Sequence, residues 1–256
     1  MVLLVFIYLH AQELYNIFNM MYWLIPLIIG LVLLAVFLVF RVKEKRVVAV
    51  VIKGFVSLMF IATALVAWLT SANPNSSFGI FVLMGLSFGL LGDVFLDIKF
   101  ITKQYELMFT ILGFFAFAFG HICYVSGLLI NFFDFTRNVF YIIVPVISGL
   151  ALMILTLLME KFTAVRYENM KPYVCIYGFA LFFTVSIFLS AAIQNGWQVT
   201  TVNIMFFALI SFALSDLILN NTYFAPGFSG PAFIISNHVL YYVGQFAIAV
   251  SLFYLL

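Results

Sequence analysis

Ionisable and hydrogen-bonding side chains interrupt the long apolar segments of this 256-residue sequence. They are candidates for chemistry, because a charge at the centre of a bilayer costs about 2.5–3.5 kcal/mol on insertion scales and such residues usually face a cavity or a partner. The set comprises Lys53, Asp93, Asp97, His121, Asp216, Asn237, His238 and Gln245, with Tyr177, Tyr241 and Tyr242 as neutral donors.

Structural roles would explain three members of this set. Asp97 falls at the end of a predicted helix, where water can solvate it. Lys53 can extend its ammonium to the membrane surface, and Gln245 is typical of a hydrogen bond between helices. Asp93 and Asp216 have no such simple explanation. Two nearby buried carboxyl groups suit acid–base catalysis, since desolvation and mutual repulsion push their pKa values apart.

The composition places these residues in a membrane protein. The chain is 66% hydrophobic and only 8% charged, whereas a typical soluble domain carries about 25% charged residues. Its mean hydropathy is +1.25, and its net charge of +2 predicts no nucleic-acid partner. Cys123 and Cys175 are too few for a disulfide framework.

Eight segments are long enough to cross the membrane as helices, since a span needs about 20 apolar residues. The predicted fold is therefore an all-α, eight-helix transmembrane domain over residues 21–256, with connections too short for a separate soluble domain. Residues 1–20 are interrupted by polar side chains, and we expect either an interfacial leader or a misassigned start there. The predicted spans are 21–40, 47–70, 77–98, 107–131, 138–159, 171–193, 199–220 and 232–256.

Basic residues orient the predicted bundle. The first, third and fifth connections hold nine of the eleven lysines and arginines. By the positive-inside rule the odd-numbered connections are cytoplasmic, and we expect a bacterial inner-membrane location. At 1.5 Å per residue, Lys53, Asp93, Tyr177, Asp216 and His238 then lie roughly 8–10 Å below the cytoplasmic interface. His121 lies deeper, at about 20 Å by the same rise.

An internal similarity links the two halves of the chain. Residues 87–97 around Asp93 resemble residues 211–220 around Asp216, and each segment is followed one span later by a His-x-x-Tyr sequence, at His121 and His238. The two halves are four spans apart and have the same orientation. This favours a parallel 4+4 helix pseudo-repeat with a site at its interface.

Four motifs together resemble the YhhN (lysoplasmalogenase-like) membrane family. They are Gly92-Asp93-x-x-Leu96-Asp97, Gly120-His121-x-x-Tyr124, Ser215-Asp216-x-x-Leu219 and the stretch from Asn237-His238 to Tyr242-x-x-Gln245. The resemblance covers residues 21–256. It implies hydrolysis of the vinyl ether bond of lysoplasmalogens to a fatty aldehyde and a glycerophospho-head group, with Asp93 and Asp216 as the catalytic pair.

The chemistry of the residues agrees with that reaction. A vinyl ether is cleaved by protonation at carbon, and water then attacks the oxocarbenium-like centre; a neutral carboxylic acid and an ionised carboxylate supply both steps, as in glycosidases. No cofactor or metal is required. We expect Lys53 to bind the head-group phosphate. The expected supporting or substrate-binding residues are Lys53, Asp97, His121, Tyr124, Tyr177, Ser215, Asn237, His238, Tyr241, Tyr242 and Gln245.

Two other functions remain open from the sequence. Buried Asp and His side chains also form proton relays, which would suit a non-enzymatic transporter or lipid-binding receptor. A metal-dependent lipid amidase or esterase would use Asp93, His121 and His238 as zinc ligands, although the depth of His121 disfavours that set. The partners predicted are a lysophospholipid and the bilayer; the oligomeric state is left undetermined.

Overall fold

The computed structural model describes the backbone of residues 2–256 and the side chains of residues 22–256. The side chains of the expected leader, residues 1–20, lie outside this part, so the nature of the leader stays an expectation.

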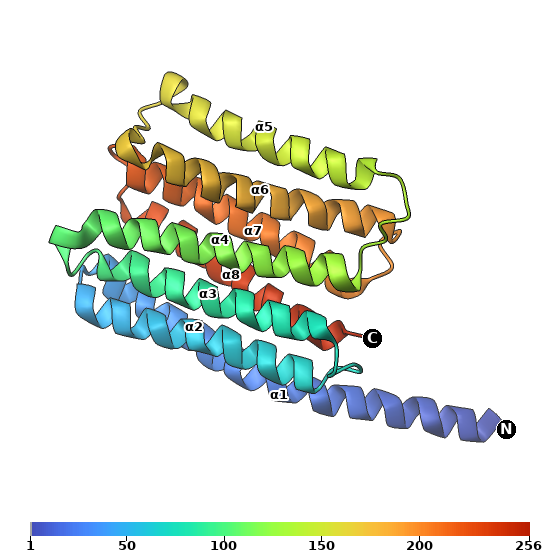
Figure 1. Cartoon of the computed structure of the whole chain (residues 1–256). Coiled ribbons are helices and arrows are strands. Elements are labelled where there is room, and N and C mark those ends of the chain that lie inside the picture. Colours follow the sequence, from blue (N-terminus) through green and yellow to red (C-terminus); the bar gives the residue numbers. More distant parts are fainter. Residues whose placement is uncertain (1) are drawn as a thin grey trace.

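Eight long helices and three short 3-10 turns form the described chain, without strands (Figure 1). The long helices are α1 (Val2–Val42), α2 (Arg46–Leu69), α3 (Ser77–Ile98), α4 (Glu106–Asn131), α5 (Phe140–Phe162), α6 (Lys171–Gln194), α7 (Thr200–Phe224) and α8 (Pro231–Ser251). The short turns are η1 (Lys103–Tyr105), η2 (Glu168–Met170) and η3 (Leu252–Tyr254).

Each long helix contains a segment long and apolar enough to cross a membrane. In α1 this segment is Tyr22–Val42. Large apolar side chains such as Ile25, Phe55 and Val144 are exposed on the outside of the bundle, where lipid would cover them. The described chain is therefore an integral multi-pass membrane protein, and the predicted all-α, eight-span fold is confirmed.

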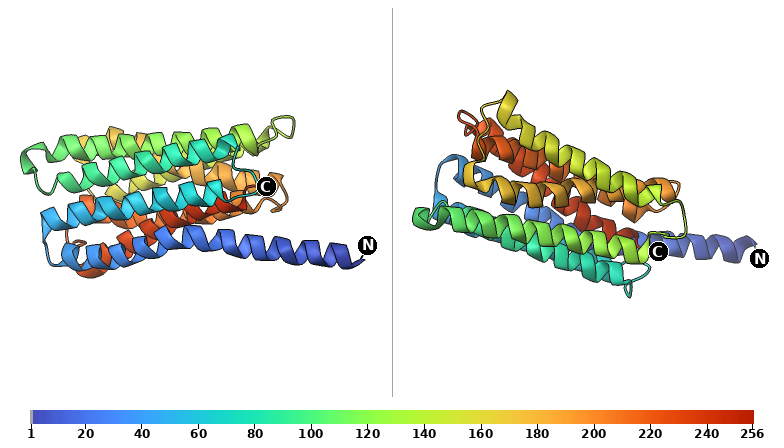
Figure 2. Two further views of the ribbon diagram at one scale, coloured as in Figure 1. Left: turned by 90° about the horizontal axis from the view of Figure 1, so that it is seen from below. Right: turned by 45° about the horizontal axis from the view of Figure 1, so that its top comes forward.

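The helices run alongside one another, and four connections meet at one end of the bundle (Figures 1 and 2). These are residues 43–45, 99–105, 163–170 and 225–230. We refer to this end as the basic end, because the first three connections hold most of the lysines and arginines that lie between helices. Both chain termini lie at the opposite end, where α1 extends past the other helices (Figure 2).

The pattern of helix packing agrees with the predicted parallel repeat. The hairpins α1–α2, α3–α4, α5–α6 and α7–α8 pack closely, and α2–α3 and α6–α7 also pack together. The two halves meet where α4 packs on α6 and where α2 packs on α8. Replacing α4 by α8 and α6 by α2, each four places along the chain, converts the first of these contacts into the second, as a parallel repeat predicts.

The aspartates obey this repeat, but the histidines do not. Asp93 and Asp216 each lie 16 residues after the first residue of their helix, at Ser77 and Thr200. His121 lies 15 residues into α4, whereas His238 lies only 7 residues into α8. Since both helices begin at the basic end, the two histidines differ in depth by roughly 12 Å. The predicted correspondence between the His-x-x-Tyr sequences is therefore wrong in space.

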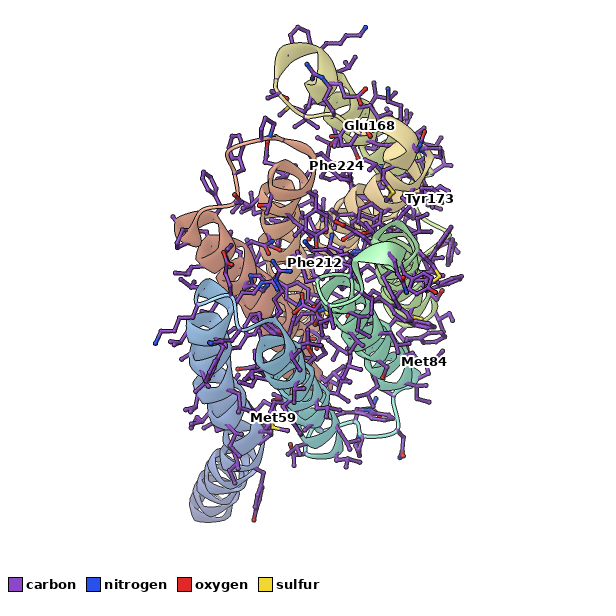
Figure 3. All side chains as sticks on the ribbon, turned by 90° about the vertical axis from the view of Figure 1, so that its left-hand side faces the viewer. Met59, Met84, Glu168, Tyr173, Phe212 and Phe224 are labelled. Carbon is purple, nitrogen blue, oxygen red and sulfur yellow. The ribbon has the colours of Figure 1, made fainter. Side chains whose placement is uncertain are left out.

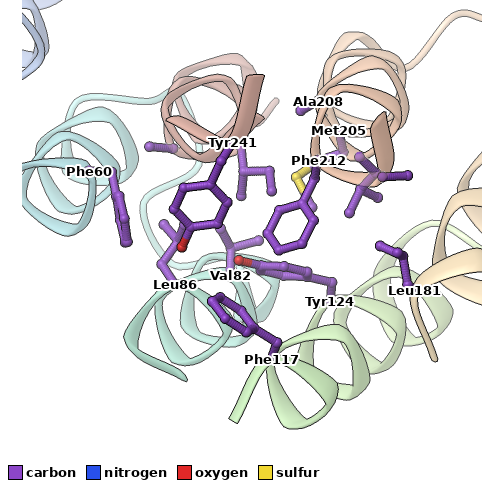
Figure 4. Packing of buried hydrophobic residues seen from close by; sticks show 14 of the residues in the cluster. Phe60, Val82, Leu86, Phe117, Tyr124, Leu181, Met205, Ala208, Phe212 and Tyr241 are labelled. Carbon is purple, nitrogen blue, oxygen red and sulfur yellow. The ribbon is translucent and has the colours of Figure 1, made fainter. Parts of the chain in front are cut away.

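Small residues and aromatic rings hold the centre of the bundle. A Cβ added at Gly120 would lie 3.0 Å from the backbone oxygen of Gly85, so α3 and α4 approach as closely as small residues allow. Phe117 of α4, Phe212 of α7 and Tyr241 of α8 then pack ring against ring, with centroids 5.3–6.0 Å apart (Figure 4). This aromatic group joins the two halves of the repeat.

Candidate functional site

A cavity of about 670 Å³ lies at the basic end of the bundle. Its lining residues come from six of the long helices, chiefly α3, α4, α7 and α8, and from the connection that follows α3. Figure 3 looks onto this end; Phe212 lies near the middle of the bundle in that view, and Glu168 lies toward the α5–α6 side. Phe117 and Tyr241, two of the three central rings, also line the cavity.

The predicted polar residues divide into those that line this cavity and those that do not. Eight line it: Lys53, Asp93, Asp97, Ser215, Asp216, Asn237, His238 and Tyr241. The convergence of α2, α3, α7 and α8 at one depth therefore brings both aspartates into one cavity. Their catalytic role stays a proposal.

Asp93 is almost fully enclosed by hydrogen-bond donors. It is 2% exposed. One carboxylate oxygen accepts hydrogen bonds from the Ser57 hydroxyl at 2.6 Å and the Tyr241 hydroxyl at 2.8 Å. The other oxygen lies 3.1 Å from the ammonium of Lys53. Two hydroxyl donors and one cation therefore stabilise the ionised carboxylate of Asp93.

Lys53 sits between two carboxylates rather than facing open space. Its ammonium also lies 3.4 Å from Asp97, whose same oxygen is 3.9 Å from the guanidinium of Arg41. Lys53 is 6% exposed, so its charge is balanced inside the protein. The expectation that Lys53 binds a phosphate therefore does not fit its contacts. The sequence placed Lys53 and the aspartates at one depth, but only the helix rotations show that they face each other.

Asp216 has a different environment. The Tyr177 hydroxyl donates a hydrogen bond to one carboxyl oxygen, and the Ser215 hydroxyl lies 3.4 Å from the other. Among the residues with described side chains, no cation lies within 4 Å of Asp216. The two aspartates thus occupy equivalent positions in the repeat with unequal partners: a lysine on α2 for Asp93 and a tyrosine on α6 for Asp216.

Asp216 also lies at the boundary between polar and apolar space. It lines a second, smaller pocket together with Phe114, Leu181 and Phe182, which carry apolar side chains from α4 and α6. Tyr223 lines both spaces as well. Asp216 therefore lies where the polar cavity meets apolar side chains of α4, α6 and α7.

Asn237 and His238, two cavity-lining residues of α8, each form a hydrogen bond with a backbone carbonyl. The side-chain amide of Asn237 donates to the backbone oxygen of Ser215 at 2.8 Å, which ties α8 to α7 one residue before Asp216. The Nδ1 atom of His238 lies 2.7 Å from the backbone oxygen of Ile234. A carbonyl can only accept, so Nδ1 carries the proton and Nε2 is left as an acceptor.

Four predicted supporting residues line neither the cavity nor the smaller pocket. Tyr242 shares a hydrogen bond of 3.2 Å with Ser57, and Gln245 donates to the Tyr241 hydroxyl at 2.8 Å, so both support the donors of Asp93. His121 lies among aromatic rings of Tyr124, Tyr177 and Phe212. Neither ring nitrogen of His121 has a hydrogen-bond partner among the described residues. His121 and Tyr124 thus contact the site only through packing.

Residues that the sequence analysis did not propose also take part. Ser57 lies four residues after Lys53, on the same helix face, and this spacing would have identified it. Arg41, Lys99 and Lys103 line the cavity, but in the sequence they served only to orient the spans. Within the part of the chain that carries described side chains, no three His, Cys, Asp or Glu residues are grouped as metal ligands, and Cys123 and Cys175 form no disulfide.

Comparison with known proteins gives one match. The model of the YhhN family matches residues 48–252, from the start of α2 to the end of α8. This range contains every candidate site residue except Arg41. No curated protein and no solved structure matches the chain.

Proposed function

The chain belongs to the YhhN family, and on that premise we propose that it is a membrane hydrolase that cleaves the vinyl ether bond of lysoplasmalogens. The family includes lysoplasmalogenases. The observation that carries the proposal is the unequal pair in one cavity: Asp93 faces a lysine at 3.1 Å, and Asp216 has only hydroxyl partners.

The pair supplies the two protonation states that the reaction needs. An ionised Asp216 would have no balancing cation beside it, whereas the neutral acid needs none. Asp216 is therefore the proton donor, and Asp93, held ionised by Lys53, is the carboxylate. The same division between a neutral acid and an ionised partner operates in glycosidases.

The reaction then balances over one cycle. Asp216 protonates the vinyl carbon nearer the chain, which leaves an oxocarbenium-like centre at the carbon bonded to oxygen. Asp93 stabilises this centre and accepts a proton as water attacks, giving a hemiacetal. The hemiacetal hydroxyl returns its proton to Asp216, while Asp93 protonates the departing glycerol oxygen. The products are a fatty aldehyde and the glycerophospho-head group.

The position of the cavity supports a single-chain lipid as substrate. Its polar mouth is at the basic end, and Asp216 borders the apolar pocket between α4 and α6. A lysolipid places its ether bond directly below the glycerol, at the boundary between head group and chain. We further propose that the basic end faces the cytoplasm, because its connections carry the excess of lysine and arginine.

Aldehyde release from a purified lysoplasmalogen tests the proposal. Asp93→Asn and Asp216→Asn preserve size and remove the titrating carboxyl group, and each should lower kcat by at least about 10²-fold, the lower range for loss of an acid or base. Asp134→Asn is the matched control, because Asp134 lies in the connection between α4 and α5 at the opposite end. Full activity in either site variant would refute the acid–base pair.

Chelation separates this mechanism from the metal-dependent alternative. We expect prolonged treatment with a chelator to leave aldehyde release unchanged. Loss of activity that added Zn²⁺ restores would instead assign the aspartates to a metal site. Binding of lysoplasmalogen without any aldehyde release by the wild-type protein would favour the transporter or receptor function.

A further inference from the structure

Lys99 is a buried cation without a carboxylate partner. It follows the last residue of α3 and is 4% exposed. Its ammonium lies 3.5 Å from the hydroxyl of Thr110. No carboxylate of the described side chains lies within 4 Å of it. Lys53, which is equally buried, has two such partners. Among the lysines with described side chains that line the cavity, Lys99 alone is buried without a carboxylate within 4 Å.

Aromatic faces hold the Lys99 ammonium in place. It lies 3.3 Å from the ring centroid of Tyr223 and 5.3 Å from that of Phe100. Ring faces attract a cation through their quadrupole, but they carry no net charge and cannot neutralise it. Burial without a carboxylate partner disfavours the charged ammonium, and an anion bound beside Lys99 would favour it.

Two further cations border the same space. Arg41 lies with its guanidinium carbon 4.1 Å from the centroid of Phe100, on the ring that also borders Lys99. Lys103 lines the cavity from η1 and is exposed at its mouth. These cations therefore border a cavity large enough for a polar ligand. Lys99 is the buried one, so water does not solvate its ammonium.

We propose that Lys99, with Arg41 and Lys103 beside it, binds the phosphate of a lysolipid head group at the mouth of the cavity. The inference rests on the proposed function in one respect, the choice of a lipid as the molecule that carries the phosphate. Lys99 takes the role that the sequence analysis expected of Lys53. Tyr223, which contacts the Lys99 ammonium, also lines the apolar pocket beside Asp216, so the phosphate and the reacting bond would lie on either side of this ring.

The acid–base behaviour of Lys99 is consistent with an anion site. Burial lowers the pKa of Lys99 to about 7, with Arg41 and Lys53 adding to this effect, while Glu106 and Asp97 oppose it. A bound phosphate would favour the charged ammonium and raise that pKa. Binding above pH 7 should therefore be accompanied by uptake of a proton, which calorimetry in two buffers of different ionisation enthalpy measures directly.

Binding of an uncleavable lipid tests the site separately from catalysis. The probe is a saturated 1-O-alkyl glycerophosphocholine, which has the phosphate but no vinyl ether, and the reference is the matching 1-O-alkylglycerol without phosphate. The protein is full length, in lipid nanodiscs. Lys99→Gln should weaken binding of the phospholipid by about 10-fold to 100-fold, as expected for loss of a charged hydrogen bond, and leave binding of the alkylglycerol unchanged.

Lys43→Gln is the matched control, because Lys43 is exposed in a connection at the same end and does not line the cavity. It should bind both lipids as the wild type does. Lys103→Gln should weaken phospholipid binding less than Lys99→Gln, since solvent screens its charge. Equal binding of both lipids by the wild type, or unchanged phospholipid binding by Lys99→Gln, would overturn the proposal. Thermal unfolding of each variant confirms that it is folded.

Inorganic phosphate distinguishes the source of the anion. If the site is built for a lipid head group, phosphate should displace the lysolipid only at concentrations at least about 100-fold higher, since phosphate lacks the apolar chain that contributes to binding of the lipid. Displacement at equal concentration would overturn the lipid assignment. The proposed hydrolysis is tested by a different readout. A protein that binds the alkyl probe through Lys99 but releases no aldehyde from lysoplasmalogen would have the anion site but not the hydrolase activity.

Discussion

Replacement of Lys53 by methionine should strongly destabilise the bundle. Methionine keeps the length of the side chain and removes its charge. In the wild type, Lys53 lies 3.1 Å from Asp93 and 3.4 Å from Asp97, and both aspartates are 2% exposed. The variant would leave two buried carboxylates with a single cation nearby, Arg41, at 3.9 Å from Asp97.

The expected cost follows from the loss of one partner of a buried ion pair, which is about 3–5 kcal/mol. Arg41 still balances Asp97, so we expect the lower part of that range, about 3 kcal/mol. The fraction of unfolded protein should then rise by roughly two orders of magnitude, since about 1.4 kcal/mol is tenfold. Most of the cost comes from Asp93, which keeps hydrogen bonds to Ser57 and Tyr241 but loses its cation.

The double variant Lys53→Met/Asp93→Asn tests this origin. Asparagine retains an oxygen that can accept from Ser57 and Tyr241, and Arg41 remains to balance Asp97. The double variant should therefore be more stable than Lys53→Met alone, with a coupling energy of about 2 kcal/mol between the two positions. Equilibrium unfolding in mixed detergent micelles, followed by circular dichroism, measures all three variants. Wild-type stability in Lys53→Met, or a double variant less stable than it, would refute the charge argument.

Three further predictions concern the fold and the cavity mouth. Reporter fusions near Ser76 and near Lys103 should report opposite sides of the membrane, and a shared side would contradict the span order. Gly244→Ala should destabilise the protein by about 1–3 kcal/mol through overpacking, because its Cβ would lie 2.9 Å from a backbone oxygen of α7. Gly54→Ala is the control: its Cβ would meet nothing within 4 Å, so this variant should be neutral or stabilising in thermal unfolding. Burial lowers the pKa of Lys99 to about 7, so the unfolded chain binds more protons than the folded chain between about pH 7 and 10.5. The free energy of unfolding of the wild type should therefore rise with pH across that window relative to that of Lys99→Met. Parallel curves for the two proteins would show that Lys99 does not titrate there.

Hydropathy alone predicted the fold, because crossing a bilayer requires about 20 apolar residues with every backbone group bonded internally, and only a helix satisfies this in a single segment. The same reasoning predicted the depth of the polar residues. A helix rises by a constant distance per residue, so Asp93 and Asp216 could be assigned to one layer from the span boundaries. The structure places both in one cavity, as that assignment requires.

The partners of each polar residue depended on the packing of the helices. Sequence position defines depth but leaves the rotation of each helix open, and a charged group's role depends on which side chains the rotation brings within about 4 Å. Lys53 and Lys99 are both lysines and are similarly buried, yet Lys53 lies between two carboxylates and Lys99 faces aromatic rings. His121 is rotated among rings and away from the cavity. Long-range packing between α2, α3, α7 and α8 therefore decided which lysine balances the aspartates and which one remains to bind an anion.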